Sequence, residues 1–445
     1  MRRYHAAWVL PITMPPVRDG TVAVADGRIV YVGRRAGAPA GDDVDLGDAA
    51  LLPGLVNAHC HLELTSMRGF LEDLDFRSWI LRLTLARREV LTRDMLVDGA
   101  RFGIDEGLAA GITTYGDTCE SGAAFDAMLE RGVRGIVYQE VFGPAPVACD
   151  EVLEELKARV AALQRRQTPL VSVGVSPHAP YTVSDRLFAA VARYASQAGL
   201  PMAIHIAESE AEQQLVVEGR GEFADALIKR GIRVEGRARS PIQLLRGLRV
   251  LDAQPLLIHC VHADAVDVHA IAASGSSVAH CPASNAKLGH GVAPLTDFLS
   301  AGVSVGLGSD SVAANNRMDI LGEARLAALQ QRARVRRPDV MPAARALRLA
   351  TIDGARALGL DAEVGSLEPG KAADLAAFPL DGRFGPTHDV ESAIVFALNG
   401  VPASLVAVAG KVLVQNGAVA HGDPALAGRV QHTANLLQQW QAGRE

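Results

Sequence analysis

Apolar runs that alternate with helical stretches fill the chain from residue 51 to about residue 345. The runs are short and bounded by Gly, Pro or polar residues, which is typical of buried strands. Eight of them stand at 51–57, 111–117, 135–141, 170–176, 202–205, 256–259, 277–280 and 303–309. Helical patterns lie between them at 93–109, 123–131, 150–166, 184–198, 210–229 and 263–274, and another follows at 341–358. Eight strand–helix units predict an α/β fold, a (β/α)₈ barrel of the TIM type.

An open, doubly wound sheet is the alternative arrangement of such units. Sheets of that kind that bind dinucleotides carry a glycine-rich loop after the first strand. The residues after 51–57 contain no such loop, so the barrel is favoured.

The two ends of the chain have a different pattern, with short strands separated by turns. Asp26-Gly27 stands between two alternating apolar runs, a strong hairpin signal. Two further strand-and-turn segments lie at 364–378 and 405–417. We expect the ends to meet in one small β-sandwich domain. The expected division is a composite β domain of residues 1–57 and 360–430, a barrel of residues 58–359, and a C-terminal helix or tail at 431–445.

Composition excludes several classes of protein. The chain has 445 residues, is 49% hydrophobic and carries a net charge of −6, which allows a large core and lacks the basic excess of nucleic-acid binders. Five cysteines without a C-x-x-C pair do not suit a disulfide framework, so we expect a reducing compartment, the cytoplasm. No apolar run is long enough to span a membrane, and the first residues do not have the pattern of a signal peptide.

Polar side chains, many of them histidines, recur at the carboxyl ends of the predicted strands, where barrels carry their active sites. His59 and His61 stand two residues apart at the end of the first run, so on a strand both would point to the same side. Two imidazoles in one cavity suit a divalent metal; a pair of surface histidines is the alternative. Later runs lead into the segments 176–181, 205–208, 259–262, 280–285 and 308–311.

These motifs resemble the amidohydrolase superfamily, in particular its cytosine-deaminase-like branch, over nearly the full length of the chain. That branch includes adenosine-type, S-adenosylhomocysteine, aminofutalosine and guanine deaminases and the triazine hydrolases. The residues that carry the resemblance are Pro53-Gly-Leu-Val-Asn-Ala-His59-Cys-His61, His205-Ile-Ala-Glu208, His259-Cys-Val-His262, Pro282-Ala-Ser-Asn285 and Gly308-Ser-Asp310.

The resemblance implies that His59, His61, His205 and Asp310 bind one metal per chain, Zn²⁺ or alternatively Fe²⁺. The two-metal branch needs a carboxylated lysine, and no Lys stands near the end of the fourth strand. The metal would provide hydroxide at neutral pH, and Asp310 would accept a proton from the water.

The same resemblance assigns two further catalytic residues. Glu208 would carry a proton from the attacking water to a ring nitrogen and then to the leaving amine. His259 would polarise the substrate or orient the water, unless it is a hydrogen-bonded core histidine. We interpret His280 and His290 as structural or rim residues, and His262 as either close to the site or on the surface.

Substrate contacts are expected from His178, Trp79, Glu63, Glu140 and Asn285. Trp79 could stack on a purine-like ring or pack a lid helix, and His178 could touch substrate or brace its proline-containing loop. Glu63 resembles the aminofutalosine deaminases, whereas Glu140 could contact substrate or pair with an arginine.

Two features leave the nature of the substrate open. The ribose-binding glutamate of the S-adenosylhomocysteine-type enzymes is not matched, because Arg88 falls at that position with Glu89 beside it. A basic run could meet an anionic substrate group, although such runs more often form a solvated face. Its members are Lys229, Arg230, Arg233, Arg237, Arg239, Arg246 and Arg249.

We therefore predict a metal-dependent aminohydrolase that deaminates an exocyclic amine of a purine nucleoside or related nitrogen heterocycle. Its partner is a small-molecule heterocyclic substrate, and the family implies a homo-oligomer, a dimer or larger. The alternative is a hydrolase with the same metal and another leaving group, from a chloro-s-triazine or a cyclic amide. Glu208 as proton donor favours deamination. A scaffold protein would have lost ligands, and the Pro-Cys-x-x-Cys of zinc cytidine deaminases is absent.

Overall fold

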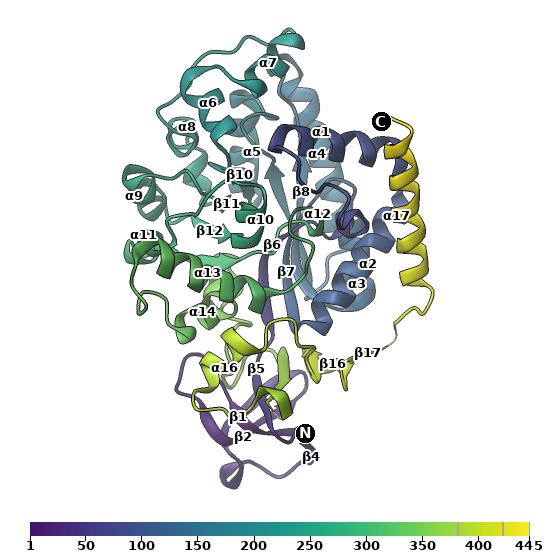
Figure 1. Ribbon diagram of the computed structural model, residues 1–445, viewed down its shortest axis with the longest axis vertical. Coiled ribbons are helices and arrows are strands. Elements are labelled where there is room, and N and C mark those ends of the chain that lie inside the picture. Colours follow the sequence, from purple (N-terminus) through teal and green to yellow (C-terminus); the bar gives the residue numbers. More distant parts are fainter. Residues whose placement is uncertain (381, 421, 445) are drawn as a thin grey trace.

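The computed structural model describes residues 1–380, 382–420 and 422–444. A barrel surrounded by helices forms the larger part, and a β domain that contains the N-terminus lies at one end of it (Figure 1). The long helix α17 (Leu426–Ala442) runs along the outside of the barrel beside α2 (Arg93–Ala109).

Two parallel sheets of four strands each, all within the described residues, form the barrel. They have the orders β6-β7-β8-β9 and β10-β11-β12-β13. Single parallel bridges, Val175 to Met202 and Cys60 to Asp310, close the circle at its two seams. The predicted barrel is confirmed. Its strands are β6 (Leu55–Cys60), β7 (Ile112–Cys119), β8 (Arg134–Val141), β9 (Val171–Pro177), β10 (Ala203–Ile206), β11 (Leu256–His259), β12 (Ser277–His280) and β13 (Val305–Leu307).

The run expected as one strand at 51–57 is instead two strands in different sheets. β5 (Ala49–Pro53) pairs with β1 and β14 in the β domain, whereas β6 pairs with β7 in the barrel. Gly54 lies between them, where a Cβ atom would approach Thr113 Oγ1 to 2.1 Å. Since both strands are entirely buried, hydrophobic periodicity does not separate them. The expected domain limits stay a prediction.

The β domain contains one sheet built from both ends of the chain, with nine strands in the described residues. Its order is β17-β16-β15-β14-β5-β1-β2-β3, with β4 beside β1. Asp26 and Gly27 both have positive φ in the hairpin between β2 and β3, as a tight turn requires. The remaining strands are β1 (Arg2–Val9), β2 (Val17–Ala25), β3 (Arg28–Arg34), β4 (Asp42–Asp45), β14 (Leu375–Pro379), β15 (Leu405–Val408), β16 (Lys411–Gln415) and β17 (Ala418–Val419).

Most helices follow the predicted pattern. The helix expected at 210–229 is divided, because Gly219 and Gly221 adopt positive φ. The terminal helix begins at Leu426, before residue 431. The other helices are α1 (Phe76–Val90), α3 (Ala123–Arg131), α4 (Cys149–Gln164), α5 (Asp185–Ala198), α6 (Glu210–Glu218), α7 (Glu222–Lys229), α8 (Pro241–Gly247), α9 (Ala265–Ser274), α10 (Pro282–Lys287), α11 (Leu295–Ser300), α12 (Val312–Asn315), α13 (Ile320–Val335), α14 (Ala343–Leu349), α15 (Ile352–Ala357) and α16 (Val390–Ala397).

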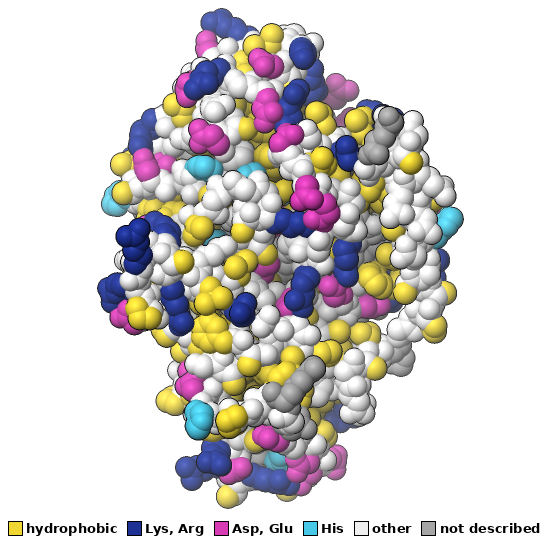
Figure 2. Space-filling model, in the orientation of Figure 1, with side chains coloured by type: hydrophobic (Ala, Val, Ile, Leu, Met, Phe, Trp, Pro, Cys, Tyr) yellow, Lys and Arg dark blue, Asp and Glu magenta, His cyan; other side chains and the backbone are white. Residues whose placement is uncertain are grey.

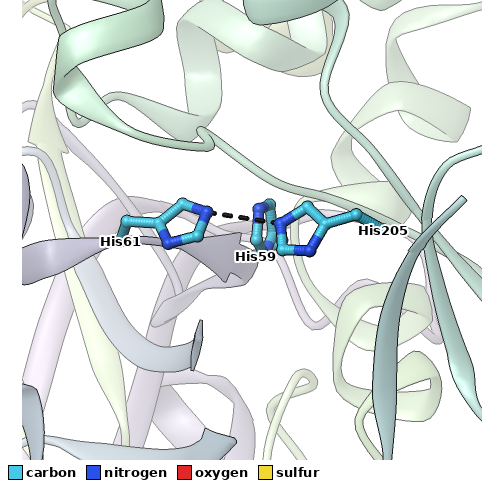
Figure 3. A group of neighbouring side chains, drawn as sticks. All are labelled: His59, His61 and His205. Carbon is cyan, nitrogen blue, oxygen red and sulfur yellow. Dashed lines mark hydrogen bonds between the residues drawn. The ribbon is translucent and has the colours of Figure 1, made fainter. Parts of the chain in front are cut away.

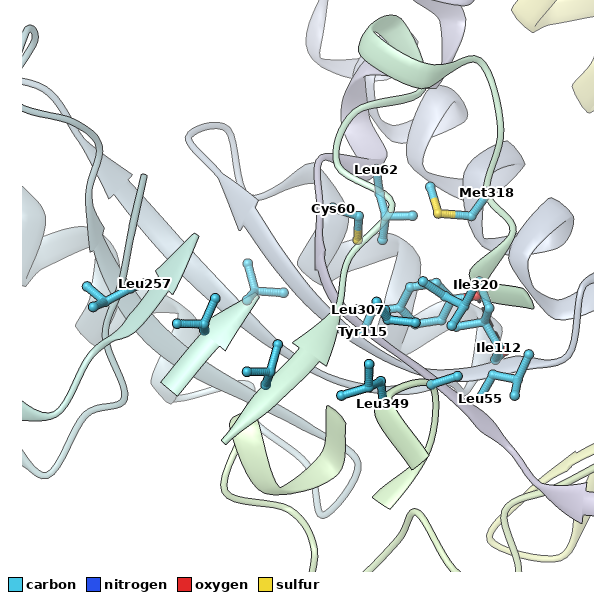
Figure 4. Close-up of a cluster of buried hydrophobic side chains, with 14 of the residues drawn as sticks. Leu55, Cys60, Leu62, Ile112, Tyr115, Leu257, Leu307, Met318, Ile320 and Leu349 are labelled. Carbon is cyan, nitrogen blue, oxygen red and sulfur yellow. Dashed lines mark hydrogen bonds between the residues drawn. The ribbon is translucent and has the colours of Figure 1, made fainter. Parts of the chain in front are cut away.

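A single large apolar cluster connects the barrel strands to the helices around them. Leu55, Ile112 and Leu307 are completely buried in it, together with the ring of Tyr115 (Figure 4). All five cysteines lie in the described residues, buried and free. None of the described helices is long and apolar enough to cross a bilayer. On the face in Figure 2, Lys and Arg side chains lie among Asp and Glu side chains.

A buried ion pair joins the β domain to the barrel. Arg134, on β8, donates from Nε and Nη2 to the two carboxylate oxygens of Asp374, at 2.9 and 3.1 Å. The two side chains are 7% and 1% exposed. Asp374 also accepts from the backbone N–H of Ala409, at 2.8 Å. Because both side chains are buried, separating them would leave a charged group without a partner and without water. The pair therefore holds the two domains together.

Replacement of Asp374 by Ala should destabilise the protein strongly, because it leaves the Arg134 guanidinium buried without its counter-charge. We expect the free energy of unfolding to fall by about 3–5 kcal/mol. The matched control is Glu235→Ala, which removes one partner of the exposed Arg233–Glu235 pair and should change stability by less than about 1 kcal/mol. Urea denaturation measures both, and equal effects of the two changes would contradict the role assigned to the buried pair.

Candidate metal centre and active-site cavity

Three imidazoles and one carboxylate converge at the carboxyl ends of the barrel strands. His59 lies on β6, His61 directly follows that strand, and His205 lies on β10 (Figure 3). Asp310 follows β13, so it comes from the opposite end of the barrel sequence. The structure thus brings together the four residues that sequence reasoning expected as ligands.

The separations between the donor atoms are those of a mononuclear site. Nε2 of His205 lies 3.3 Å from Nε2 of His61. Oδ1 of Asp310 lies 3.3 Å from Nε2 of His59 and 3.6 Å from Nε2 of His61. Ligand atoms about 2.0–2.1 Å from one zinc ion and about 90–120° apart are separated by about 2.9–3.6 Å, an arrangement that also leaves a position for water. The residues present therefore fit a divalent metal ion.

Burial sets the protonation of these groups. Desolvation lowers the pKa of His59 to about 4 and also lowers the pKa of His61 and His205. Burial alone would raise the pKa of Asp310, but the hydrogen bond with His59 and the nearby histidines outweigh it and lower that pKa. At neutral pH the cluster therefore presents neutral imidazoles and an ionised carboxylate, the forms that bind metals.

Glu208 lies beside this cluster with two histidines against it. Its Oε1 is 3.4 Å from Nε2 of His259 and 3.5 Å from Nε2 of His290. Burial raises the pKa of Glu208, yet the two adjacent histidines, His259 and His290, prevail and lower it. From the sequence, His290 was interpreted as a structural or rim residue. It belongs to no sequence motif, because it lies in the loop after α10.

Asn285 takes a different position from the one expected of a substrate contact. It is fully buried, and its Oδ1 lies 2.9 Å from Nδ1 of His259. Nδ1 of His259 therefore donates to the amide oxygen of Asn285, which orients the ring so that Nε2 faces Glu208. His280 is also buried, whereas His262 is partly exposed, 4.0 Å from Glu210.

The turns that follow the strands have unusual backbone geometry. Ala207, His259, Cys260 and Asp310 adopt positive φ values of 51°, 73°, 49° and 57°. A non-glycine residue in this region costs about 1–3 kcal/mol, and such residues cluster at functional sites. The strain is located where β10, β11 and β13 end.

A cavity of about 500 Å³ opens beside these residues. Its wall includes Trp79 and Phe76 from α1, stacked with their planes 18° apart. His178 also lines it, with Nδ1 fixed 2.7 Å from Thr182 Oγ1, and its ring centre lies 4.8 Å from that of His205. His61, His205, Glu208, His259 and Asp310 face the same cavity.

One side of the cavity is acidic. Glu63 is buried and accepts from Arg87 Nη2 at 2.7 Å, and Arg87 also pairs with Glu120. Glu140 has an Oε1 atom without a hydrogen-bond partner among the described residues, and burial raises its pKa well above the usual value. Glu63 and Glu140 both line the cavity. Arg87 lines the cavity on this side, whereas Arg88 is exposed and pairs with Glu89.

The basic run between β10 and β11 contributes little to the cavity. Four of its members pair with nearby carboxylates: Arg233 with Glu235, Arg237 with Asp185, Arg239 with Asp264 and Arg249 with Asp252. Arg230, at the end of α7, is the member of the run that lines the cavity. Most of the run is therefore a solvated face.

Residues 50–413 match the family described as "Amidohydrolase family". A 5-methylthioadenosine/S-adenosylhomocysteine deaminase of Moorella thermoacetica is 35% identical over 417 residues, which cover 92% of this chain and 93% of that protein. The crystal structure of a zinc-bound adenosine deaminase from Xanthomonas campestris has a TM-score of 0.88 and 30% identity, and the match covers 98% of each chain.

The zinc complex of an atrazine chlorohydrolase from Arthrobacter aurescens has a TM-score of 0.83 at 26% identity and covers 98% of this chain and 100% of its own. Similar proteins therefore include enzymes with two different leaving groups. With the motifs, the barrel and these similarities together, the chain belongs to the amidohydrolase family.

Proposed function

We propose that this protein is a metal-dependent aminohydrolase that removes the exocyclic amine of a purine nucleoside as ammonia. One observation carries the proposal: a buried glutamate with a lowered pKa, Glu208, faces the same cavity as His61, His205 and Asp310, which with His59 are arranged for one metal. A cavity of about 500 Å³ is large enough for a nucleoside-sized ligand. The deaminase names of the similar proteins support the same reaction class.

We propose that His59, His61, His205 and Asp310 hold a single divalent cation. Zinc is the favoured ion because it is bound in the similar adenosine deaminase, and Fe²⁺ is the alternative. When bound, the metal would act as a Lewis acid and make water nucleophilic at neutral pH.

Glu208 is the residue that moves protons in the proposed reaction. As a carboxylate it accepts a proton from the attacking water and delivers it to a ring nitrogen of the substrate. It then takes up the second proton of that water, from the hydroxyl group now bonded to the ring carbon, and passes it to the departing amine, which leaves as ammonia. His259 directs Nε2 toward Glu208 and the reacting centre, and Asn285 holds the ring in that orientation.

The remaining cavity residues are proposed to bind the nucleoside. Trp79 lies in the apolar wall, where it can pack against a flat heterocycle. Burial raises the pKa of Glu140 and so favours the protonated form, which can donate a hydrogen bond, and its carboxyl group lies within 4.8 Å of ring nitrogens of His178 and His205. Glu63, held by Arg87, supplies an acceptor for hydroxyl groups. An excess of acidic groups on this side favours a neutral, hydroxyl-bearing substrate portion.

A substrate panel tests the reaction class. Zinc-loaded protein should release ammonia from at least one adenine nucleoside among adenosine, S-adenosylhomocysteine, 5′-deoxyadenosine and aminofutalosine, and less efficiently from guanine, cytosine or melamine. Incubation with atrazine, followed by measurement of released chloride, tests the alternative leaving group suggested by the similar chlorohydrolase. Chloride release without ammonia release from any nucleoside would overturn the deaminase assignment.

Glu208→Gln should lower kcat by about 10²–10⁴-fold, because the amide cannot carry the proton, while metal content stays the same. Glu210→Gln is the matched control, since its side chain is 70% exposed two residues away and should leave kcat within about twofold. Ammonia release and elemental analysis measure both variants. Full activity of Glu208→Gln would remove the proton-transfer role.

Removal of the metal should abolish turnover reversibly. Dialysis against a strong chelator should stop ammonia release, and one equivalent of Zn²⁺ should restore it. His205→Ala should fail to retain the ion, because a neutral imidazole ligand is lost. His262→Ala, whose partly exposed ring contacts Glu210 instead, should keep it. Turnover by metal-free protein would contradict the proposal.

A further inference from the structure

A second glutamate, Glu212, lies directly behind Glu208 and does not face the cavity. Its side chain is completely buried at the start of α6. Oε1 accepts from the backbone N–H of Ala207 and Oε2 accepts from the backbone N–H of Glu208, both at 2.9 Å. One carboxylate therefore holds two consecutive amides of the segment that joins His205 to Glu208.

The geometry of the turn is what makes this double contact possible. Ala207 has a φ of 51°, in the left-handed region that non-glycine residues rarely adopt. A left-handed residue lets successive N–H groups point toward one acceptor, which forms a small anion-binding concavity. The backbone of Ala207 is also fixed from outside, because its carbonyl accepts from His262 N–H at 2.9 Å.

Helix capping alone does not account for this arrangement. Ser209 and Glu212 have the spacing of a capping box, and Ser209 Oγ accepts from Glu212 N–H at 3.2 Å. In a capping box the glutamate would accept from the N–H of Ser209, yet here it accepts from the two preceding residues. A cap at the surface also needs only one such contact, whereas Glu212 is completely buried and uses both of its oxygens.

We propose that Glu212 is a positioning residue that fixes the backbone of Glu208 and so aims the Glu208 carboxyl group at the reacting atoms. The inference rests on the proposed proton-transfer role of Glu208. Among the described residues, Glu212 itself belongs neither to the cavity lining nor to the metal-ligand cluster. The effect of Glu212 on turnover should therefore depend entirely on Glu208.

The chain offers a matched control in Glu323, on α13. Glu323 is also buried, and its Oε2 accepts from the backbone N–H of Ala283, at 3.0 Å. Ala283 neighbours Ser284, whose hydroxyl donates to Asp310. The two glutamates thus brace different turns of the site in the same chemical way.

The first measurement is amide hydrogen exchange, which needs no substrate. Glu212→Gln should raise the exchange rates of the amides of Ala207 and Glu208 by about tenfold or more, because the substituted amide group presents a donor to one of them. The amide of Ala283 should be unchanged. Glu323→Gln should give the reverse pattern. Unchanged exchange at residues 207 and 208 in Glu212→Gln would overturn the proposal.

The second measurement is a double-mutant cycle on the best substrate of the panel. Glu212→Gln alone should lower kcat by about 10–100-fold with KM within about threefold, and should cause no further loss in the Glu208→Gln background. Glu323→Gln should lower activity by a similar factor in both backgrounds. Equal losses from Glu212→Gln in both backgrounds would show a general structural role and overturn the positioning role.

Two results separate this inference from the proposed function. Failure of the wild-type protein to release ammonia refutes the proposed function, while the exchange pattern still decides whether Glu212 holds the turn. If the wild-type protein releases ammonia but the effects of Glu212→Gln and Glu208→Gln on kcat are additive, the positioning role alone is refuted. If Glu212→Gln does not fold, Glu212→Asp, whose carboxylate is one methylene shorter, is carried through the same two measurements with the same expectations.

Discussion

The carboxylate and the backbone of Asp310 connect the closure of the barrel to the assembly of its site. The Asp310 N–H donates to the carbonyl of His59 at 3.0 Å, which joins the last barrel strand to the first. The side chain of the same residue lies against His59 and His61 and accepts from Ser284. A neighbouring contact strengthens the seam, where Asn57 donates to Ser309 Oγ at 2.7 Å. A change that opens this seam therefore also separates the groups that face the cavity.

Buried carboxyl groups replace regular hydrogen bonding where the strands end. Asp117 accepts from Leu62 N–H at 2.7 Å, Glu212 accepts from the turn after β10, and Glu323 accepts from the turn after β12. Each of these backbone amides would otherwise be a buried donor without a partner, which costs about 1–3 kcal/mol. The side chains thus allow irregular turns with left-handed residues to be rigid. Rigid turns hold catalytic groups in fixed positions relative to one another.

The cavity has an apolar wall and an acidic side. On the acidic side Arg87 lines the cavity, and it is already paired with Glu63 and Glu120. A flat ring can pack against Trp79 while polar substituents reach Glu63 and Glu140. Arg230 stands apart at the end of α7 and is exposed to solvent. The acidic side of the cavity and the positive charge of Arg230 are thus separated in the folded chain. The sequence does not show this separation, because Arg87 and Arg230 are far apart along it.

Hydrophobic pattern and local motifs determined the barrel, the strand-end histidines and the composite β domain, because strand and helix periodicities are local properties of the chain. The resemblance of the strand-end motifs to the amidohydrolase superfamily named His59, His61, His205, Asp310 and Glu208, which the fold brings together. Only the tertiary structure divided the first run at Gly54, placed His290 beside Glu208, and put Asn285 against His259 instead of in the cavity wall. Those features depend on contacts between residues remote in sequence or in irregular loops, where no periodicity exists. The role of Glu212 also depends on a turn geometry that becomes visible only after folding.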